Sequence, residues 1–331
     1  MAKELSWKDV VPELLPERVM EHFPVHREPI IPTLDKPVII ESACPGWQVG
    51  GERYPAIPYT IEDQVKESID SFRAGAVAVH IHPRDPKTGV AQVNPHLLKE
   101  VMDPVFDAVG DIVTLNHTWT ATEEANYINE TEELLKLGKG NKYCQGSVVL
   151  PAGFRSGTGA YHTERSVSEG VKWLEEMSVK PIYQLYDTFV SWGLKQKVFD
   201  RGIGGWKPFV FNLHLGKHHA HAIHKDPWSL LQLITNYHMV ADTMPGSVVG
   251  VYPGGRNWIP ILVLGLLLGT QLVRVGVEDC YWFYPHKDEI IQKNSDTVTL
   301  AVEIIERLGR RVVRDPGEAR KILGMELTST G

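Results

Sequence analysis

Two histidines one residue apart, His80 and His82, are the side chains of this sequence best placed to bind a metal ion. They follow the apolar run 76–79, and residues i and i+2 of a β-strand point to the same face, so both imidazoles can reach one ion. Glu278, after another apolar run, could add a carboxylate and leave positions open for substrate. Zinc is the first choice for such a set, although iron, manganese or nickel would accept it.

Arg274 and Asp279 lie on either side of Glu278 in the sequence. They could form a structural salt bridge. Alternatively, Asp279 is a general base, and Arg274 orients it or binds a substrate carboxylate with two hydrogen bonds. A metal ion that polarises a ketone, next to a carboxylate base, suits enolate chemistry.

Two other motifs compete for a function. Gly254, Gly255 and Arg256 precede a predicted helix and could bind a phosphate or carboxylate, although a plain glycine turn explains them equally well. A histidine tract could bind metal and is the main rival to the first site, but we interpret it as a solvated loop in which one residue, His214, could face the pocket. The tract comprises His214, His218, His219, His221 and His224.

Charge and hydrophobicity exclude several classes of protein. The 331 residues carry a formal charge of −7, which argues against a nucleic-acid or anionic-membrane partner. The longest apolar stretch, 259–270, is too short to cross a bilayer, and residues 1–23 lack the apolar core of a signal peptide. The three cysteines form no CxxC pair, which favours reduced thiols. The sequence therefore predicts a cytoplasmic protein without a membrane segment.

Eight short runs rich in β-branched residues recur, each separated from the next by room for one helix. Most are continuously apolar, as expected for parallel strands covered on both faces. The predicted strands are 37–43, 76–82, 112–118, 143–150, 181–187, 208–214, 247–252 and 271–277. The predicted helices are 60–73, with Thr60 as a cap, 95–108, 122–137, 166–178, 189–200, 227–241, 257–268 and a closing helix within 288–308.

This alternation predicts an α/β fold, and the count favours a (β/α)8 TIM barrel. We expect one barrel domain over 35–331, preceded by an N-terminal arm or helix over 1–34. Active sites of such barrels lie at the carboxyl ends of the strands. Strands two and eight both flank strand one in a closed barrel, so His80, His82 and Glu278 can converge on one ion.

The chain resembles the β-keto acid cleavage enzymes, typified by 3-keto-5-aminohexanoate cleavage enzyme, from about residue 35 to residue 325. The segments that carry the resemblance are 37–40 leading to Gly46, 78–85, 255–260 and 273–279. The resemblance implies a zinc-dependent barrel, usually a tetramer, that converts a β-keto acid and acetyl-CoA into acetoacetate and a new CoA thioester. It also implies that His80, His82 and Glu278 bind zinc, and that Arg274 and Asp279 remove the proton from the keto acid.

The substrate pocket departs from the family pattern. Gln48 stands where the family has an acidic residue, and His117, Thr118 and Trp119 replace its Ser-Thr-Gly-Gly at strand three. Ser147 takes the place of a pocket threonine. Five aromatic residues could line the pocket, although ordinary packing is the simpler interpretation of them. They are Trp47, Trp119, Trp258, Trp282 and Tyr284. The predicted substrate-binding residues are Gln48, His117, Thr118, Ser147 and Arg256.

Two other functions remain open from the sequence. One is a metal-dependent aldolase or hydrolase that uses the same site without CoA. The other is a non-catalytic metal-holding barrel in which Arg274 and Asp279 are a structural pair.

Overall fold

The computed structural model describes residues 29–46, 57–116, 127–149, 163–186, 190–216 and 228–325. The chain divides after Pro32 into two units, and the second, Thr33–Gly331, contains the barrel. The predicted N-terminal arm lies almost wholly outside the described residues, so its boundary at residue 34 stays a prediction.

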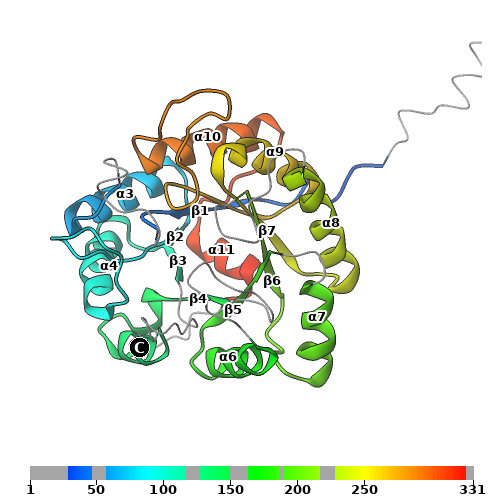
Figure 1. Ribbon diagram of the computed structural model, residues 1–331, viewed down its shortest axis with the longest axis horizontal. Helices are drawn as coiled ribbons and strands as arrows, with labels where there is room; N and C mark the ends of the chain where they lie inside the picture. The colour runs from blue at the N-terminus through cyan, green and yellow to red at the C-terminus, as the bar shows by residue number, and fades with distance from the viewer. Residues whose placement is uncertain are drawn as a thin grey trace, which may run out of the picture. The chain divides into compact units, whose positions relative to one another are not determined.

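Eight parallel strands form a closed barrel in chain order, with β8 paired to β1, which confirms the predicted (β/α)8 fold (Figure 1). Each observed strand overlaps its predicted run. The strands are β1 (Ile39–Ala43), β2 (Ala78–His80), β3 (Val113–Asn116), β4 (Gly146–Val149), β5 (Lys180–Leu185), β6 (Val210–Leu215), β7 (Val248–Pro253) and β8 (Leu272–Val275).

Helices connect the strands and surround the barrel (Figure 1). The predicted cap is present, because the Thr60 hydroxyl accepts a hydrogen bond from the Asp63 amide. No helix within the described segments combines the length and apolar character that a membrane crossing requires. The α-helices are α3 (Ile61–Ala74), α4 (Pro95–Val109), α5 (Tyr127–Lys136), α6 (Glu164–Glu176), α7 (Val190–Lys197), α8 (Trp228–Thr243), α9 (Trp258–Leu268), α10 (Asn294–Arg307) and α11 (Pro316–Leu323), and the 3-10 helices are η3 (Gly140–Tyr143), η4 (Phe199–Arg201) and η5 (Gly255–Asn257).

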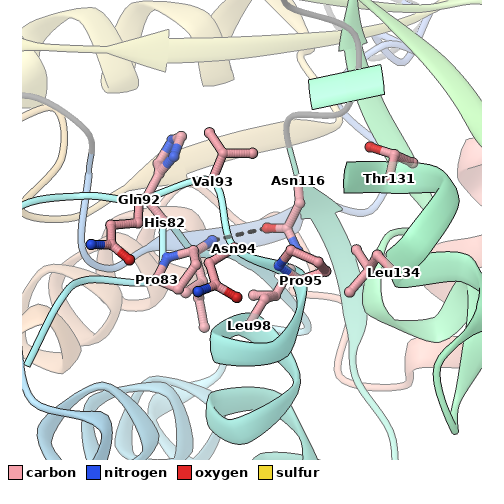
Figure 2. Close-up of a pocket in the computed structure, with 11 residues that line it drawn as sticks. His82, Pro83, Gln92, Val93, Asn94, Pro95, Leu98, Asn116, Thr131 and Leu134 are labelled. Atoms are coloured by element: carbon pink, nitrogen blue, oxygen red, sulfur yellow. Dashed lines mark hydrogen bonds between the residues drawn. The ribbon is translucent and has the colours of Figure 1, made fainter. Parts of the chain in front are cut away.

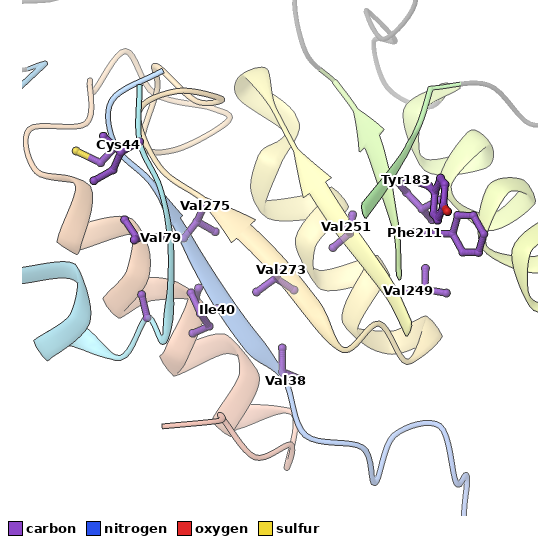
Figure 3. Packing of buried hydrophobic residues seen from close by; sticks show 14 of the residues in the cluster. Val38, Ile40, Cys44, Val79, Tyr183, Phe211, Val249, Val251, Val273 and Val275 are labelled. Atoms are coloured by element: carbon purple, nitrogen blue, oxygen red, sulfur yellow. The ribbon is translucent and has the colours of Figure 1, made fainter. Parts of the chain in front are cut away.

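The strands are apolar on both faces because each face meets a separate core. Outward-pointing residues such as Ile40, Phe211 and Val273 belong to the cluster between strands and helices (Figure 3). Inward-pointing residues near the strand starts pack with Ala319 and Leu323 of α11. Helix α11 therefore covers the amino-terminal end of the barrel, and the carboxyl end is left for chemistry.

Two of the boundaries that differ from the prediction have causes visible in the structure. The closing helix begins at Asn294 rather than near residue 288, because Ile290 forms an antiparallel bridge with Trp282 in the loop after β8. Strand β2 ends at His80, since the next amide, that of Ile81, donates to the Asn116 side chain at 2.9 Å instead of to a strand carbonyl. The side-chain alternation nevertheless continues to His82.

Candidate metal centre and acid–base pair

Strand β1 lies between β2 and β8 and holds their carboxyl ends together. Ala43 is in register with His80, and Glu41 is in register with Arg274. The first and last parts of the barrel sequence therefore meet at one point of its mouth, as the strand count predicts.

Three possible ligand atoms converge there. The Nε2 atom of His80 lies 3.0 Å from Nε2 of His82 and 3.1 Å from Oε2 of Glu278. All three ligand atoms lie within 4.8 Å of one another. Ligand atoms of a tetrahedral zinc ion, each bound at about 2.0 Å, are about 3.3 Å apart. The spacing therefore fits a small divalent cation.

The protonation of these side chains also suits metal binding. The Nδ1 atom of His80 lies 2.6 Å from the Leu115 carbonyl, an arrangement that places the proton on Nδ1 and leaves the Nε2 lone pair for a metal. Burial, together with neighbouring His80, lowers the pKa of His82 to about 3, so its imidazole is neutral. Burial alone would raise the pKa of Glu278, but the Arg274 guanidinium and His80 hold it well below its usual range.

Glycine is required at position 46 to make room for Glu278. A Cβ atom on Gly46 would lie 2.0 Å from Cγ of Glu278 and 2.8 Å from its Cα. The buried Arg84 side chain fixes this part of the chain, because it donates to the carbonyl oxygens of Gly46 and Gly89. The HxHxRD segment thus supplies two possible ligands and also the arginine that anchors the loop facing the third.

A network around Asn294 fixes the backbone just before Glu278. The Asn294 side chain accepts a hydrogen bond from the Val277 amide at 2.9 Å and donates to the hydroxyls of Ser42 and Ser71. Gly276 has a φ of +135°, and a Cβ there would lie 2.4 Å from the Ala43 carbonyl oxygen. The glycine of the RxGxED segment therefore permits the turn that carries Glu278 to the histidines.

Arg274 and Asp279 form a buried pair with two hydrogen bonds. Nε and Nη2 of Arg274 donate to the two oxygens of Asp279 at 2.7 and 3.0 Å. The Nη2 atom also lies 2.5 Å from Oε1 of Glu278. Burial would lower the pKa of Arg274, but Asp279, Glu278 and Glu41 raise it well above its usual value. This guanidinium therefore joins the predicted base to the predicted metal ligand.

A third carboxylate, that of Glu41, faces Arg274 from β1 and was not expected from the sequence. Its Oε1 atom lies 3.9 Å from Nη1 of Arg274, and its Oε2 atom accepts a hydrogen bond from the Tyr252 hydroxyl. The Arg274 guanidinium also lies 4.8 Å from the centre of the Tyr252 ring. An acidic residue in the apolar run 37–43 is the sequence signal that could have revealed this contact.

A small cavity borders the histidine pair on the side of α4 and α5. His82, Asn116 and Leu134 are among its lining residues, and Figure 2 shows the Asn116 side chain accepting the hydrogen bond from the Ile81 amide. Its volume of about 40 Å³ leaves room for one or two water molecules but not for a keto acid. This cavity is therefore too small to be a binding site for such a substrate.

Of the remaining predicted binding residues, the structure describes Ser147 and Arg256. Ser147 lies on the same side of β4 as Val149, whose side chain belongs to the outer core, whereas Gly146 faces Leu115 and Ile182 inside the barrel. Arg256 donates to the Lys287 carbonyl, pairs with Asp288 and lies 4.0 Å from the Trp282 ring centre, so it holds the loop after β8. Gln48, His117 and Thr118 lie outside the described residues, as do Trp47, Trp119, His218, His219, His221 and His224.

His214 and Trp258, two possible pocket residues from the sequence, lie in different surroundings in the structure. His214 faces the barrel interior, where its ring stacks on Tyr186 at 4.5 Å between centroids. Trp258 is fully buried, and its indole nitrogen donates to the carbonyls of Trp282 and Phe283. Trp258 therefore has a packing role, which is the simpler of the two interpretations of the aromatic residues.

The chain is similar to known proteins over most of its length. A family model described as beta-keto acid cleavage enzyme matches residues 37–325. A 3-keto-5-aminohexanoate cleavage enzyme of Acetoanaerobium sticklandii is 26% identical over 300 residues, covering 87% of this chain and 98% of that enzyme. A 3-dehydrocarnitine:acetyl-CoA trimethylamine transferase of Rhizobium meliloti is 24% identical over 319 residues, covering 88% and 97%.

One solved structure with a similar fold is titled a ternary complex of ObcA with C4-CoA adduct and oxalate. Its TM-score is 0.64 at 16% sequence identity, and the match covers 82% of this chain and 68% of ObcA. This likeness concerns the fold alone. The family model, by contrast, extends over nearly the whole barrel and includes the two segments that meet at the metal site. The chain therefore belongs to the β-keto acid cleavage enzyme family.

Proposed function

We propose that this protein binds a divalent metal ion, with zinc as the first choice, and transfers CoA from acetyl-CoA to the acyl part of a β-keto acid. The products would be acetoacetate and a new acyl-CoA. One observation carries the proposal: His80, His82 and Glu278 converge, and the same Arg274 side chain contacts both Glu278 and Asp279. A metal ion held by the three ligands would act as a Lewis acid on the keto oxygen.

Asp279 is the proposed general base. Its carboxylate takes a proton from C2 of the keto acid and leaves an enolate. The enolate carbon attacks the thioester carbonyl of acetyl-CoA, and the CoA thiolate departs. Arg274 donates to both oxygens of Asp279 and so holds the carboxylate in one orientation during this step.

The second half reverses the same chemistry. The CoA thiolate attacks the former 3-keto carbon, and the bond between C2 and C3 breaks to give the new acyl-CoA and an acetoacetate carbanion. Asp279 returns its proton to that carbanion. One carboxyl group thus accepts and later donates the same proton, and the overall exchange of acyl groups is redox-neutral.

The names of the relatives support acetyl-CoA as the co-substrate. The Rhizobium meliloti relative is named an acetyl-CoA trimethylamine transferase, and a Paraburkholderia graminis relative is named 3,5-dioxohexanoate:acetyl-CoA acetone transferase. Their different acyl parts show that the keto acid varies among relatives, so the substrate of this chain must be found by experiment. The tetrameric state and the cytoplasmic location stay predictions from the sequence.

A screen of β-keto acids tests the proposal. The protein is first analysed for metal and then incubated with each acid, with and without acetyl-CoA, while acetoacetate and new thioesters are measured by mass spectrometry. We expect one or more acids to give both products only when acetyl-CoA and metal are present. Cleavage without CoA would instead favour an aldolase or hydrolase, and bound metal without turnover across the panel would favour a non-catalytic barrel.

A further inference from the structure

We propose that Glu41, held by Tyr252, is a positioning residue that fixes the Arg274 guanidinium so that its Nε and Nη2 edge faces Asp279. The inference rests on the proposed function, because it assigns Asp279 the role of base. Within the described part of the chain, Glu41 accepts a hydrogen bond from Tyr252 and faces Arg274. Its proposed role acts through Arg274 alone.

The barrel places Glu41 and Arg274 at the same level on adjacent strands. The two residues are direct register partners between β1 and β8, and both point into the barrel interior. Glu41 is fully buried, and Arg274 and Tyr252 are each 1% exposed. Such closely packed side chains have few alternative rotamers.

Each side of the guanidinium has its own contact. The Nε and Nη2 atoms donate to Asp279, the Nη1 atom faces the Glu41 carboxylate at 3.9 Å, and one flat face lies over the Tyr252 ring. Without Glu41, the guanidinium would lack a charged neighbour on its Nη1 side. Asp279 would then be held by an arginine that can tilt away from it.

Charge balance argues against a merely stabilising role. Arg274 already contacts two carboxylates, those of Glu278 and Asp279. Burial raises the pKa of Glu41 despite the attraction of Arg274. A buried ionic group of this kind adds little to the stability of a fold, but it can hold neighbouring side chains in one arrangement.

Three variants and one control test the inference. Glu41→Gln keeps the size of the side chain and an acceptor for Tyr252 but removes the charge. Tyr252→Phe keeps the ring under Arg274 and removes the hydroxyl that holds Glu41. The third variant combines both changes. Asp111→Asn is the matched control, since Asp111 forms a paired contact with buried Arg320 at the opposite end of the barrel.

Kinetics on the metal-loaded enzyme give the first readout. We expect Glu41→Gln to lower kcat by about 10- to 100-fold with little change in KM, and the double variant to be no worse than Glu41→Gln alone. Asp111→Asn should keep the parental kcat. A Glu41→Gln enzyme with the parental kcat overturns the proposal. The proposal is also overturned if Glu41→Gln loses activity only in proportion to its unfolded fraction, as measured by thermal unfolding.

Hydrogen exchange gives a second readout that does not depend on turnover. In protein labelled with [15N]arginine, the Nε proton of Arg274 should exchange with water about tenfold faster in Glu41→Gln, and at the parental rate in Asp111→Asn. If the parent protein turns over no β-keto acid, the proposed function fails, and the exchange rates then decide the role of Glu41. Faster exchange supports positioning, and unchanged exchange overturns it.

Discussion

Replacing Gly46 with alanine tests the geometry of the metal site directly. The new Cβ atom would lie 2.0, 2.5 and 2.8 Å from Cγ, Cβ and Cα of Glu278. Carbon atoms in ordinary contact are about 3.5 to 4.0 Å apart, so Glu278 would have to move by about 1.5 Å. Gly46 itself cannot retreat freely, because Arg84 holds its carbonyl oxygen.

A displacement of this size is large for a metal ligand. Metal–ligand distances vary by only about 0.2 Å in well-formed sites, so the carboxylate would leave the coordination sphere. We expect zinc affinity to fall by at least about 10- to 100-fold. This loss corresponds to about 1.4 to 2.8 kcal/mol of binding free energy.

Competition with a chromophoric zinc chelator at fixed pH measures this affinity. Gly193→Ala is the control, since a Cβ at that position of α7 meets no atom within 4 Å. The urea unfolding of the metal-free variants shows whether both remain folded. The steric reasoning is refuted if folded Gly46→Ala binds zinc as tightly as the parent and Gly193→Ala proteins do.

Three further predictions concern other buried side chains of the barrel. Asp279→Asn should lower the rate of acetoacetate formation by about 10²- to 10⁴-fold while the bound zinc, measured by elemental analysis, stays unchanged; full activity would exclude Asp279 as the base. Asn294→Ala should lower the free energy of unfolding, measured in urea, by about 2 to 4 kcal/mol, because the Val277 amide and the hydroxyls of Ser42 and Ser71 lose their partner. A change near zero would contradict the role of this network. Burial lowers the pKa of Lys180 to about 7 from an ordinary 10.5. Between these pH values the folded protein therefore binds fewer protons than the unfolded chain. The contribution of Lys180 to the free energy of unfolding consequently rises with pH across that window. The stability gained by Lys180→Met, taken as its free energy of unfolding minus that of the parent, should therefore be greatest below pH 7 and decline toward pH 10.5. A gain that does not change with pH would contradict the lowered pKa of Lys180.

The barrel was predictable because its strands are short and apolar on both faces. Runs such as 208–214 and 247–252 have the composition of buried parallel strands, and the observed β6 and β7 overlap them. The alternation of side chains placed His80 and His82 on one face, and barrel closure brought Glu278 to them. These inferences need only the order of the elements.

Contacts that depend on strand register or loop conformation could not be predicted. Glu41 meets Arg274 only because β1 and β8 pair in one particular register. Ile290 and Ile291 belong to the apolar pattern of the predicted closing helix, but both pair with the preceding segment of the same loop. Arg256 was expected to bind an anion, and its observed contacts are with the Lys287 carbonyl and Asp288.

The position of β1 between β2 and β8 has a consequence for folding. A metal ion bound by His80, His82 and Glu278 would link the second strand to the loop after the last, and so close the ring of strands near its seam. Such an ion cannot be held by these three side chains before both ends of the barrel have docked on β1. The affinity for the metal would then report on ring closure, because the ion binds only a barrel in which β1 is paired with both β2 and β8.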